Sequence, residues 1–305
     1  MSLRRAVTVR AYAKVNLCLE VLGRRQDGYH DLATVFAAVS LHDTLTLTLE
    51  RGHWVAGAVE LAVDGWAVPR GPENLVVRAA KLLMKHAGEV GRLPGGLRVS
   101  LTKRIPPGGG LGGGSADAAA TLVGLKELLA LELGPEELVT LAAELGSDVA
   151  FFASQAPAAL GEGRGERLSP LPAPRLPALT LVWPGEPVGT AWAYGLLTAQ
   201  DFSDGDAARS LAEALNREDE LQGHPALGRN AFLRPVLEVR PDLAVVMQRL
   251  EEAGARVVSL AGSGACLWGA FADIAEAADA ARALEREGLW AQPVTPVAAG
   301  VELIR

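Results

Sequence analysis

The residues best suited to chemistry lie in one glycine-rich segment, Pro106-Pro107-Gly108-Gly109-Gly110-Leu111-Gly112-Gly113-Gly114-Ser115. Glycine has no Cβ, so this backbone can adopt positive φ and approach a ligand closely. A helical pattern covers Ser115–Leu131 directly afterwards, and the unpaired amides at a helix N-terminus favour negative charge. The segment therefore predicts a phosphate-binding loop that leads into a helix.

Other interpretations of this segment can be weighed from the sequence. Glycine-rich runs often form flexible linkers, but here Leu97–Thr102 alternates like a strand before the run and a helix follows it. The spacing Gly108-x-Gly110-x-x-Gly113 satisfies the dinucleotide-binding pattern GxGxxG, although no strong candidate for a ribose-binding acid follows. A Walker A loop does not fit, because no lysine precedes Ser115.

Three charged positions add candidate chemistry, each with a plain structural alternative. Asp148 stands between a helical pattern and the apolar run Val149–Phe152, so it is either a helix N-cap or a general base for a substrate hydroxyl. Lys14 interrupts an apolar strand, where it either faces solvent or meets an anion in a cleft. Lys103, directly before the glycine-rich segment, supplies positive charge for phosphate or is simply solvated at a strand end.

An aromatic and an imidazole follow a turn signal in Asp27-Gly28-Tyr29-His30. Tyr29 and His30 could stack on and hydrogen-bond a nucleobase. As an isolated pair, they could equally be ordinary surface residues.

The composition limits the classes of protein and partner. With 305 residues and 49% hydrophobic content, the chain predicts one large or two moderate domains. A net charge of −7 argues against nucleic acid or an anionic membrane as partner. No apolar run is long enough for a transmembrane helix. Two cysteines give no disulfide framework, so they predict buried thiols and a cytoplasmic location.

The elements that must position these residues form two α+β halves, predicted as domains 1–160 and 161–305. Two strands with a kink are expected over Ala6–Leu22. The glycine-rich residues 161–165 and the proline-rich residues 169–177 are expected to connect the halves. Further strands are expected at residues 45–49, 178–183, 257–260 and 265–271, and helices at 74–87, 115–131, 135–145, 241–254 and 274–288.

Four separated motifs together resemble the GHMP kinases, a family of small-molecule kinases. They are Lys14 with Asn16, the glycine-rich segment, Gly146-Ser147-Asp148, and Gly262-Ser263-Gly264-Ala265, in the family's order and spacing. The resemblance implies a two-domain α+β fold with the active site in the cleft between an N-terminal ATP-binding domain and a C-terminal domain. It implies ATP as phosphoryl donor with Mg²⁺, Lys14 and Asp148 as the catalytic pair, and residues Pro106–Ala116 as the ATP-phosphate loop.

The match is strongest to family members whose acceptor is the C2 hydroxyl of the methylerythritol part of a cytidine-diphosphate substrate, in the non-mevalonate route to isoprenoid precursors. This implies a cytidine site at Tyr29 and His30. Tyr194 would be a second aromatic there, at a position where another member of the family has phenylalanine. Asn16 and the residues Gly262, Ser263 and Gly264 would lie near the acceptor and phosphates. Asn74 would line the adenine pocket, Lys103 would assist the nucleotide site, and Ser115 would bind Mg²⁺ or cap its helix.

Two other functions are compatible with the same motifs. One is another small-molecule kinase of the family, of the homoserine or mevalonate type, whose acceptor has no base to stack. The other is a non-catalytic metabolite sensor, which would have no chemical need for both Lys14 and Asp148. The oligomeric state is open between monomer and homodimer.

Overall fold

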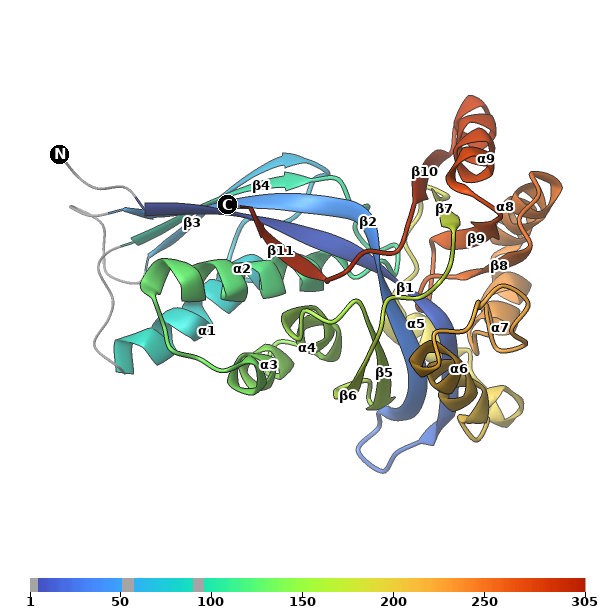
Figure 1. Ribbon diagram of the computed structural model, residues 1–305, viewed down its shortest axis with the longest axis horizontal. Helices are drawn as coiled ribbons and strands as arrows, with labels where there is room; N and C mark the ends of the chain where they lie inside the picture. The colour runs from blue at the N-terminus through green and yellow to red at the C-terminus, as the bar shows by residue number, and fades with distance from the viewer. Residues whose placement is uncertain (1–4, 51–57, 90–95, 305) are drawn as a thin grey trace.

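Two lobes share one long antiparallel hairpin in the computed structural model, which describes residues 5–50, 58–89 and 96–304 (Figure 1). The hairpin strands are β1 (Arg5–Arg24) and β2 (His30–Glu50). In the first lobe the sheet order is β11-β1-β2-β4-β3, and β5 pairs with β2 and with β6. The added strands are β3 (Val59–Gly65), β4 (Gly96–Lys103), β5 (Ala158–Gly163), β6 (Arg167–Leu171) and β11 (Val301–Ile304).

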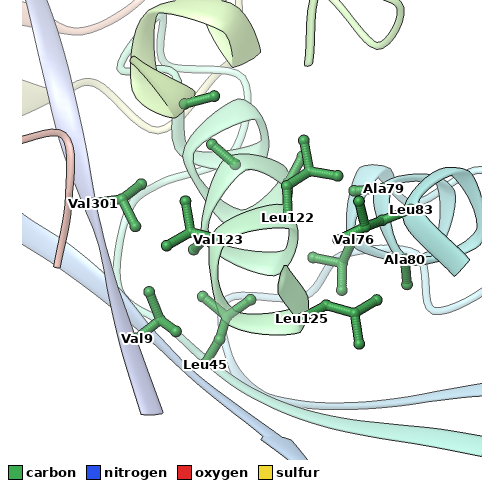
Figure 2. Packing of buried hydrophobic residues seen from close by; sticks show 14 of the residues in the cluster. Val9, Leu45, Val76, Ala79, Ala80, Leu83, Leu122, Val123, Leu125 and Val301 are labelled. Carbon is green, nitrogen blue, oxygen red and sulfur yellow. The ribbon is translucent and has the colours of Figure 1, made fainter. Parts of the chain in front are cut away.

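Four helices lie on one side of this sheet: α1 (Leu75–Glu89), α2 (Gly113–Leu129), α3 (Pro135–Ala143) and α4 (Ser147–Ala153) (Figure 1). Helix α2 is buried over most of its length because it packs between the strands and α1. Figure 2 shows Val123 facing Val9 and Val301, while Leu125 lies toward α1. An inner helix of this kind is held firmly, so its N-terminus is a fixed point for the loop that precedes it.

The second lobe is a four-stranded antiparallel sheet of order β10-β7-β9-β8 with helices packed on it. Its strands are β7 (Ala178–Trp183), β8 (Val257–Leu260), β9 (Leu267–Phe271) and β10 (Trp290–Val294). Its helices are α5 (Thr190–Gly195), η1 (Ala199–Asp201), α6 (Asp206–Asn216), α7 (Leu233–Val239), α8 (Pro241–Glu252) and α9 (Ile274–Arg286).

The two lobes have a shared core. The half of the β1–β2 hairpin nearer its turn leaves the first lobe and packs in the second. Leu17 and Val35 of the hairpin belong to the same buried cluster as Leu211 of α6 and Trp268 of β9. Apolar burial across this junction favours one arrangement of the lobes and so fixes the cleft between them.

Most elements lie within a few residues of their predicted ranges, and the α+β class is confirmed. The predicted kink is wrong as a strand break: β1 is continuous, and its register against β2 shifts between Tyr12 and Ala13. Residues 161–165 are also not a connection, because they complete β5 and its turn into β6. The predicted boundary at residue 160 falls within β5, and the division into 1–160 and 161–305 stays a prediction.

The composition-based expectations on cysteines and membrane spans can also be compared with the structure. Cys18 and Cys266 are buried and unpaired, as expected for small apolar side chains. Burial, with a smaller contribution from Glu20, raises the pKa of Cys18 to about 12. Among the described residues, every helix is too short or too polar to cross a bilayer.

Candidate active site

The glycine-rich loop connects β4 to α2, as predicted. Its last position before the helix, Gly112, has φ +72° and forms the N-cap without any side-chain hydrogen bond. A Cβ at Gly112 would lie 2.9 Å from the ring of Phe152 and 3.1 Å from Cγ of Lys14. The loop therefore needs glycine here, and the first amides of α2 remain available for an anion.

The loop is held by backbone contacts with both lobes. The amide of Lys14 on β1 donates to the carbonyl of Leu111 at 3.0 Å, and the amide of Cys266 donates to the carbonyl of Gly109 at 3.1 Å. Gly110, with φ +77°, lies directly against the carbonyl of Ala261. These three contacts restrict the conformations of the loop backbone before any ligand binds. The entropic cost of binding is therefore lower.

Lys14 is buried, so the solvent-facing alternative is wrong. Its residue exposure is only 4%, and Nζ donates to Oδ1 of Asn16 at 2.8 Å and lies 3.7 Å from Oδ2 of Asp148. Nδ2 of Asn16 donates to Oγ1 of Thr34 at 2.8 Å, and that hydroxyl donates to the carbonyl of Cys18 at 2.7 Å. This chain of hydrogen bonds fixes the ammonium group at the cavity wall.

Asp148 lies in the first turn of α4 and is not its N-cap. The cap position is Gly146, which has no side-chain cap. The carboxylate faces Lys14 and is 37% exposed, so it can reach both a buried cation and a bound hydroxyl. Residues 134 positions apart in the chain are thus brought together by β1 and α4.

A cavity of about 470 Å³ joins these groups between the lobes. Lys14, Asn16 and Asp148 line it together with residues Pro106–Ser115 of the loop. Gly262 and Ser263 of the second lobe close it. Its size and its few convergent polar groups are typical of a small-molecule site.

A groove of about 780 Å³ adjoins this cavity and contains the predicted aromatic residues Tyr29, His30 and Tyr194. The rings of His30 and Tyr194 stack with centroids 4.8 Å apart, whereas Tyr29 is 57% exposed. Burial raises the pKa of Tyr194 to about 12, and Asp148 adds to the shift. Burial, assisted by the charge of Arg24, lowers the pKa of His30, so a neutral imidazole is favoured.

The third motif, Gly262-Ser263-Gly264, is positioned by a residue that sequence reasoning missed. Asn230 is buried, and its Nδ2 donates to the carbonyls of Leu260 at 3.1 Å and Gly262 at 2.9 Å. Its Oδ1 accepts from the amide of Phe232 at 2.9 Å. A Cβ at Gly262 would lie 3.3 Å from Nζ of Lys14, so the motif closely approaches the buried ammonium.

Replacing Asn230 with aspartate should lower the free energy of unfolding by about 1–3 kcal/mol, because a carboxylate would face two carbonyls that need a donor. Urea denaturation of Asn230→Asp and the wild type measures this. An unchanged midpoint would show that the two carbonyls find other donors.

Comparison with known proteins identifies the family. Residues 74–156 match the family model described as "GHMP kinases N terminal domain", and residues 211–289 match "GHMP kinases C terminal". Together they cover more than half of the chain. The chain belongs to the GHMP kinase family. As kinases of this family use ATP as phosphoryl donor, the cavity between the lobes is the candidate site for phosphoryl transfer.

Relatives of this GHMP kinase carry a more specific name. The chain is 40% identical over 281 residues to the 4-diphosphocytidyl-2-C-methyl-D-erythritol kinase of Pelotomaculum thermopropionicum, covering 92% of this chain and 94% of the relative. It is 41% identical over 274 residues to that of Moorella thermoacetica, covering 88% and 90%.

Two solved structures are similar to this GHMP kinase. One is a 4-(cytidine 5'-diphospho)-2C-methyl-D-erythritol kinase, with a TM-score of 0.76, 38% identity and coverage of 96% of this chain and 99% of that chain. A homoserine kinase from Cytophaga hutchinsonii has a TM-score of 0.74 at 20% identity, with coverage of 100% and 99%. The second likeness shows the fold alone.

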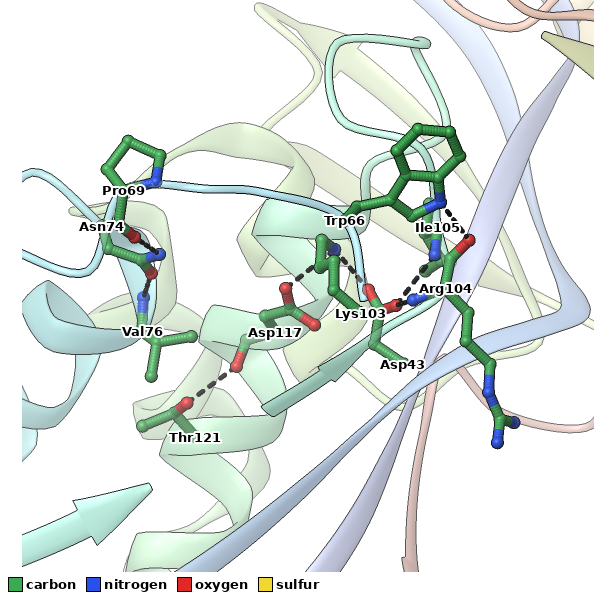
Figure 3. Close-up of polar contacts among 10 residues, drawn as sticks. All are labelled: Asp43, Trp66, Pro69, Asn74, Val76, Lys103, Arg104, Ile105, Asp117 and Thr121. Carbon is green, nitrogen blue, oxygen red and sulfur yellow. Dashed lines mark hydrogen bonds and ion pairs between the residues drawn. The ribbon is translucent and has the colours of Figure 1, made fainter. Parts of the chain in front are cut away.

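Lys103 is buried in a polar cluster next to the loop of this GHMP kinase, so the solvated strand-end alternative is wrong, and its part in the nucleotide site stays a prediction (Figure 3). It is 3% exposed and forms ion pairs with Asp43 and, at 2.9 Å, with Asp117 of α2. Oδ1 of Asp43 also accepts from the amides of Arg104 and Ile105. The cluster therefore anchors both ends of the loop, since Asp43 holds residues 103–105 and Asp117 belongs to the first turns of α2.

Asp117 gives a pH-dependence prediction, because one ammonium cannot neutralise two carboxylates. Burial raises the pKa of Asp117 to about 8, against the attraction of Lys103. The folded protein therefore holds a proton that the unfolded chain releases near the ordinary aspartate pKa of 3.8. This contribution to stability is lost as the pH rises toward 8. The free energy of unfolding of the wild type should therefore fall as the pH rises from 5 to 8. In Asp117→Asn this fall should be smaller by about 2–4 kcal/mol. Urea denaturation at several pH values measures this. An equal change in unfolding free energy with pH in both proteins would contradict the prediction.

Two other predicted nucleotide contacts, Asn74 and Ala116, have hydrogen-bond partners within the fold. Asn74 donates through Nδ2 to the carbonyl of Pro69 at 2.6 Å and accepts through Oδ1 from the amide of Val76 at 2.8 Å, so it fixes the start of α1 (Figure 3). Its neighbour Leu75 lines the cavity instead. Ala116 is fully buried in α2 and its amide bonds to the carbonyl of Gly112, so it does not line the cavity.

Several cavity residues were missed because they stand outside recognisable motifs. Thr34 bonds to Asn16, Thr190 lies at the start of α5, and Arg164 stands in a glycine-rich segment that was interpreted as a connection. For Arg164 the sequence offers one signal, which is its position between Gly163 and Gly165. Glycines on both sides leave room for an arginine side chain to reach a ligand.

Proposed function

We propose that this GHMP kinase transfers the γ-phosphoryl group of ATP to the C2 hydroxyl of 4-diphosphocytidyl-2-C-methyl-D-erythritol. The observation that carries the proposal is that the cavity between the lobes opens into the groove beside it. The cavity with Lys14 and Asp148 shares six lining residues with the groove that contains Tyr29, His30 and Tyr194. An acceptor with a base at one end and a hydroxyl at the other fits such a pair. The names of relatives about 40% identical over most of the chain support the same acceptor.

The proposed roles follow from the charges of phosphoryl transfer. The amides of the loop and of the first turn of α2 hold the donor phosphates. Lys14 offsets charge that grows on the transferred group, and Asn16 keeps its ammonium in place. Asp148 accepts the proton of the acceptor hydroxyl and, through Lys14, is held in a fixed position. The protein contributes orientation and charge, since little covalent chemistry is required of it.

Magnesium is proposed to enter with ATP. The described residues contain no group of three or more histidine, cysteine or carboxylate side chains that could hold a metal ion alone. The hydroxyl of Ser115 lines the cavity. One protein oxygen suits Mg²⁺, which keeps phosphate and water ligands and would neutralise phosphate charge when bound.

The base groove is proposed to hold cytidine, with Tyr29 and Tyr194 as stacking rings and His30 as a hydrogen-bonding group. His30 stacks on Tyr194 in the structure, so the imidazole occupies one face of this ring. We propose residues 1–160 as the ATP-binding domain, residues 161–305 as the second domain, and a cytoplasmic location, in keeping with two unpaired buried cysteines.

The test is ADP release from ATP and Mg²⁺ with 4-diphosphocytidyl-2-C-methyl-D-erythritol, beside homoserine and mevalonate. Turnover with the first acceptor alone is expected. Turnover with either control acceptor would favour another small-molecule kinase of the family. ATP binding without turnover on any acceptor would favour a sensor.

A further inference from the structure

Arg164 lies where the cavity and the base groove meet. Its side chain belongs to the turn between β5 and β6 and lines both spaces. The guanidinium lies over the ring of Tyr29, 4.8 Å from its centroid. A planar cation against an aromatic face is held in a preferred orientation while its N–H groups remain free at the edges.

The guanidinium of Arg164 has no hydrogen-bonded partner among the described residues, and its contacts are the ring of Tyr29 and the more distant charge of Asp27. Lys14 and Arg164 are the two lysine or arginine side chains that line these spaces within residues 5–50, 58–89 and 96–304. Lys14 is engaged by Asn16 and Asp148. Over the same described ranges, the guanidinium of Arg164 forms no hydrogen bond and no ion pair.

The nearby carboxylates are already engaged. Asp27, which faces Arg164, binds Nε of Arg25 and accepts from the amide of Tyr29. Glu166 accepts through Oε2 from the backbone amide of Arg164 at 2.6 Å, which fixes the turn. These contacts hold the backbone and leave the guanidinium for an anion.

The proposed acceptor has an anion at that place. If its base lies in the groove and its hydroxyl beside Asp148, its diphosphate must cross the junction. A buried phosphate needs a charged partner, and arginine matches phosphate oxygens with two parallel N–H donors.

Resting on the proposed function, we propose that Arg164 binds the diphosphate of the acceptor and so selects nucleoside-diphosphate-linked acceptors over unlinked ones. Tyr29 then has two tasks, because it stacks on the base and orients the guanidinium.

The test is calorimetric titration of the full chain with CDP and with cytidine. The wild type should bind CDP more tightly than cytidine. Arg164→Gln should weaken CDP binding about 10- to 100-fold and leave cytidine binding unchanged. Arg164→Lys should recover part of the loss, because it keeps the charge without the paired donors.

Arg167→Gln is the matched control. Arg167 is exposed in β6 of the same hairpin and lines neither space, so CDP binding should not change. Equal CDP binding by Arg164→Gln and the wild type would overturn the inference. So would an equal loss of CDP and cytidine, which would assign Arg164 to the base site.

The two proposals fail differently. A wild type that binds cytidine and CDP equally overturns the role of Arg164 and leaves the base site standing. A wild type that binds neither overturns the proposed acceptor and the role of Arg164 with it.

Discussion

Asp148→Asn is expected to lower kcat about 10²- to 10⁴-fold while ATP still binds. The amide keeps the size of the carboxylate but cannot accept a proton from the acceptor hydroxyl. Asp148 also lies 3.7 Å from Nζ of Lys14, so part of the loss comes from a less well-oriented ammonium. ADP release under saturating substrates measures kcat, and titration with an ATP analogue measures binding.

Asp64→Asn controls for the loss of one negative charge. Asp64 is exposed in β3 and does not line the cavity. Its kcat should equal that of the wild type. Near-normal turnover by Asp148→Asn would remove the general-base role and leave Asp148 as a partner of Lys14.

Gly110→Ala is expected to lower the free energy of unfolding by about 2–5 kcal/mol and to raise the KM for ATP about tenfold or more. Two costs coincide at this residue. Its φ of +77° disfavours any side chain, and a Cβ would overlap the carbonyl oxygen of Ala261 and lie 3.0 Å from that of Gly264. Both obstacles are backbone atoms, so the loop itself must move away from the phosphate-binding position.

Gly195→Ala is the matched control for stability. A Cβ at Gly195 would meet nothing within 4 Å, and its φ is not in the left-handed region. Its melting temperature should stay level or rise slightly. An equal melting temperature and KM for Gly110→Ala and the wild type would show that the loop adapts without cost.

Local chemistry made the phosphate loop predictable from the sequence. Glycine between a strand and a helix has few structural uses, and the first turn of α2 follows directly from that pattern. The pairing of Lys14 with Asp148 could not be predicted from the residues alone, because it depends on where β1 and α4 pack. The family resemblance supplied that pairing, and the distance between them agrees with it.

The internal partners of the predicted nucleotide contacts could not be predicted from the sequence. Lys103 and Asn74 have the residue types of ligand contacts, and in the structure they also pair with Asp43, Asp117 and the turn before α1. Such partners lie far away in sequence, Asp43 being 60 positions from Lys103. Arg164 is the opposite case. The glycine-rich residues 161–165 resemble a flexible connection in the sequence, but in the structure they place the Arg164 side chain at the site.

Strand β11 has a consequence for how the chain acquires its structure. It pairs with β1, and Tyr12 donates a hydrogen bond to Glu302, 290 positions later. During synthesis, β1 leaves the ribosome long before β11, while the far half of the hairpin waits for α6 and β9 to cover it. Neither lobe can close early, so folding should be largely post-translational and slow, as high contact order implies. The same interlock should make the finished molecule melt in a single transition.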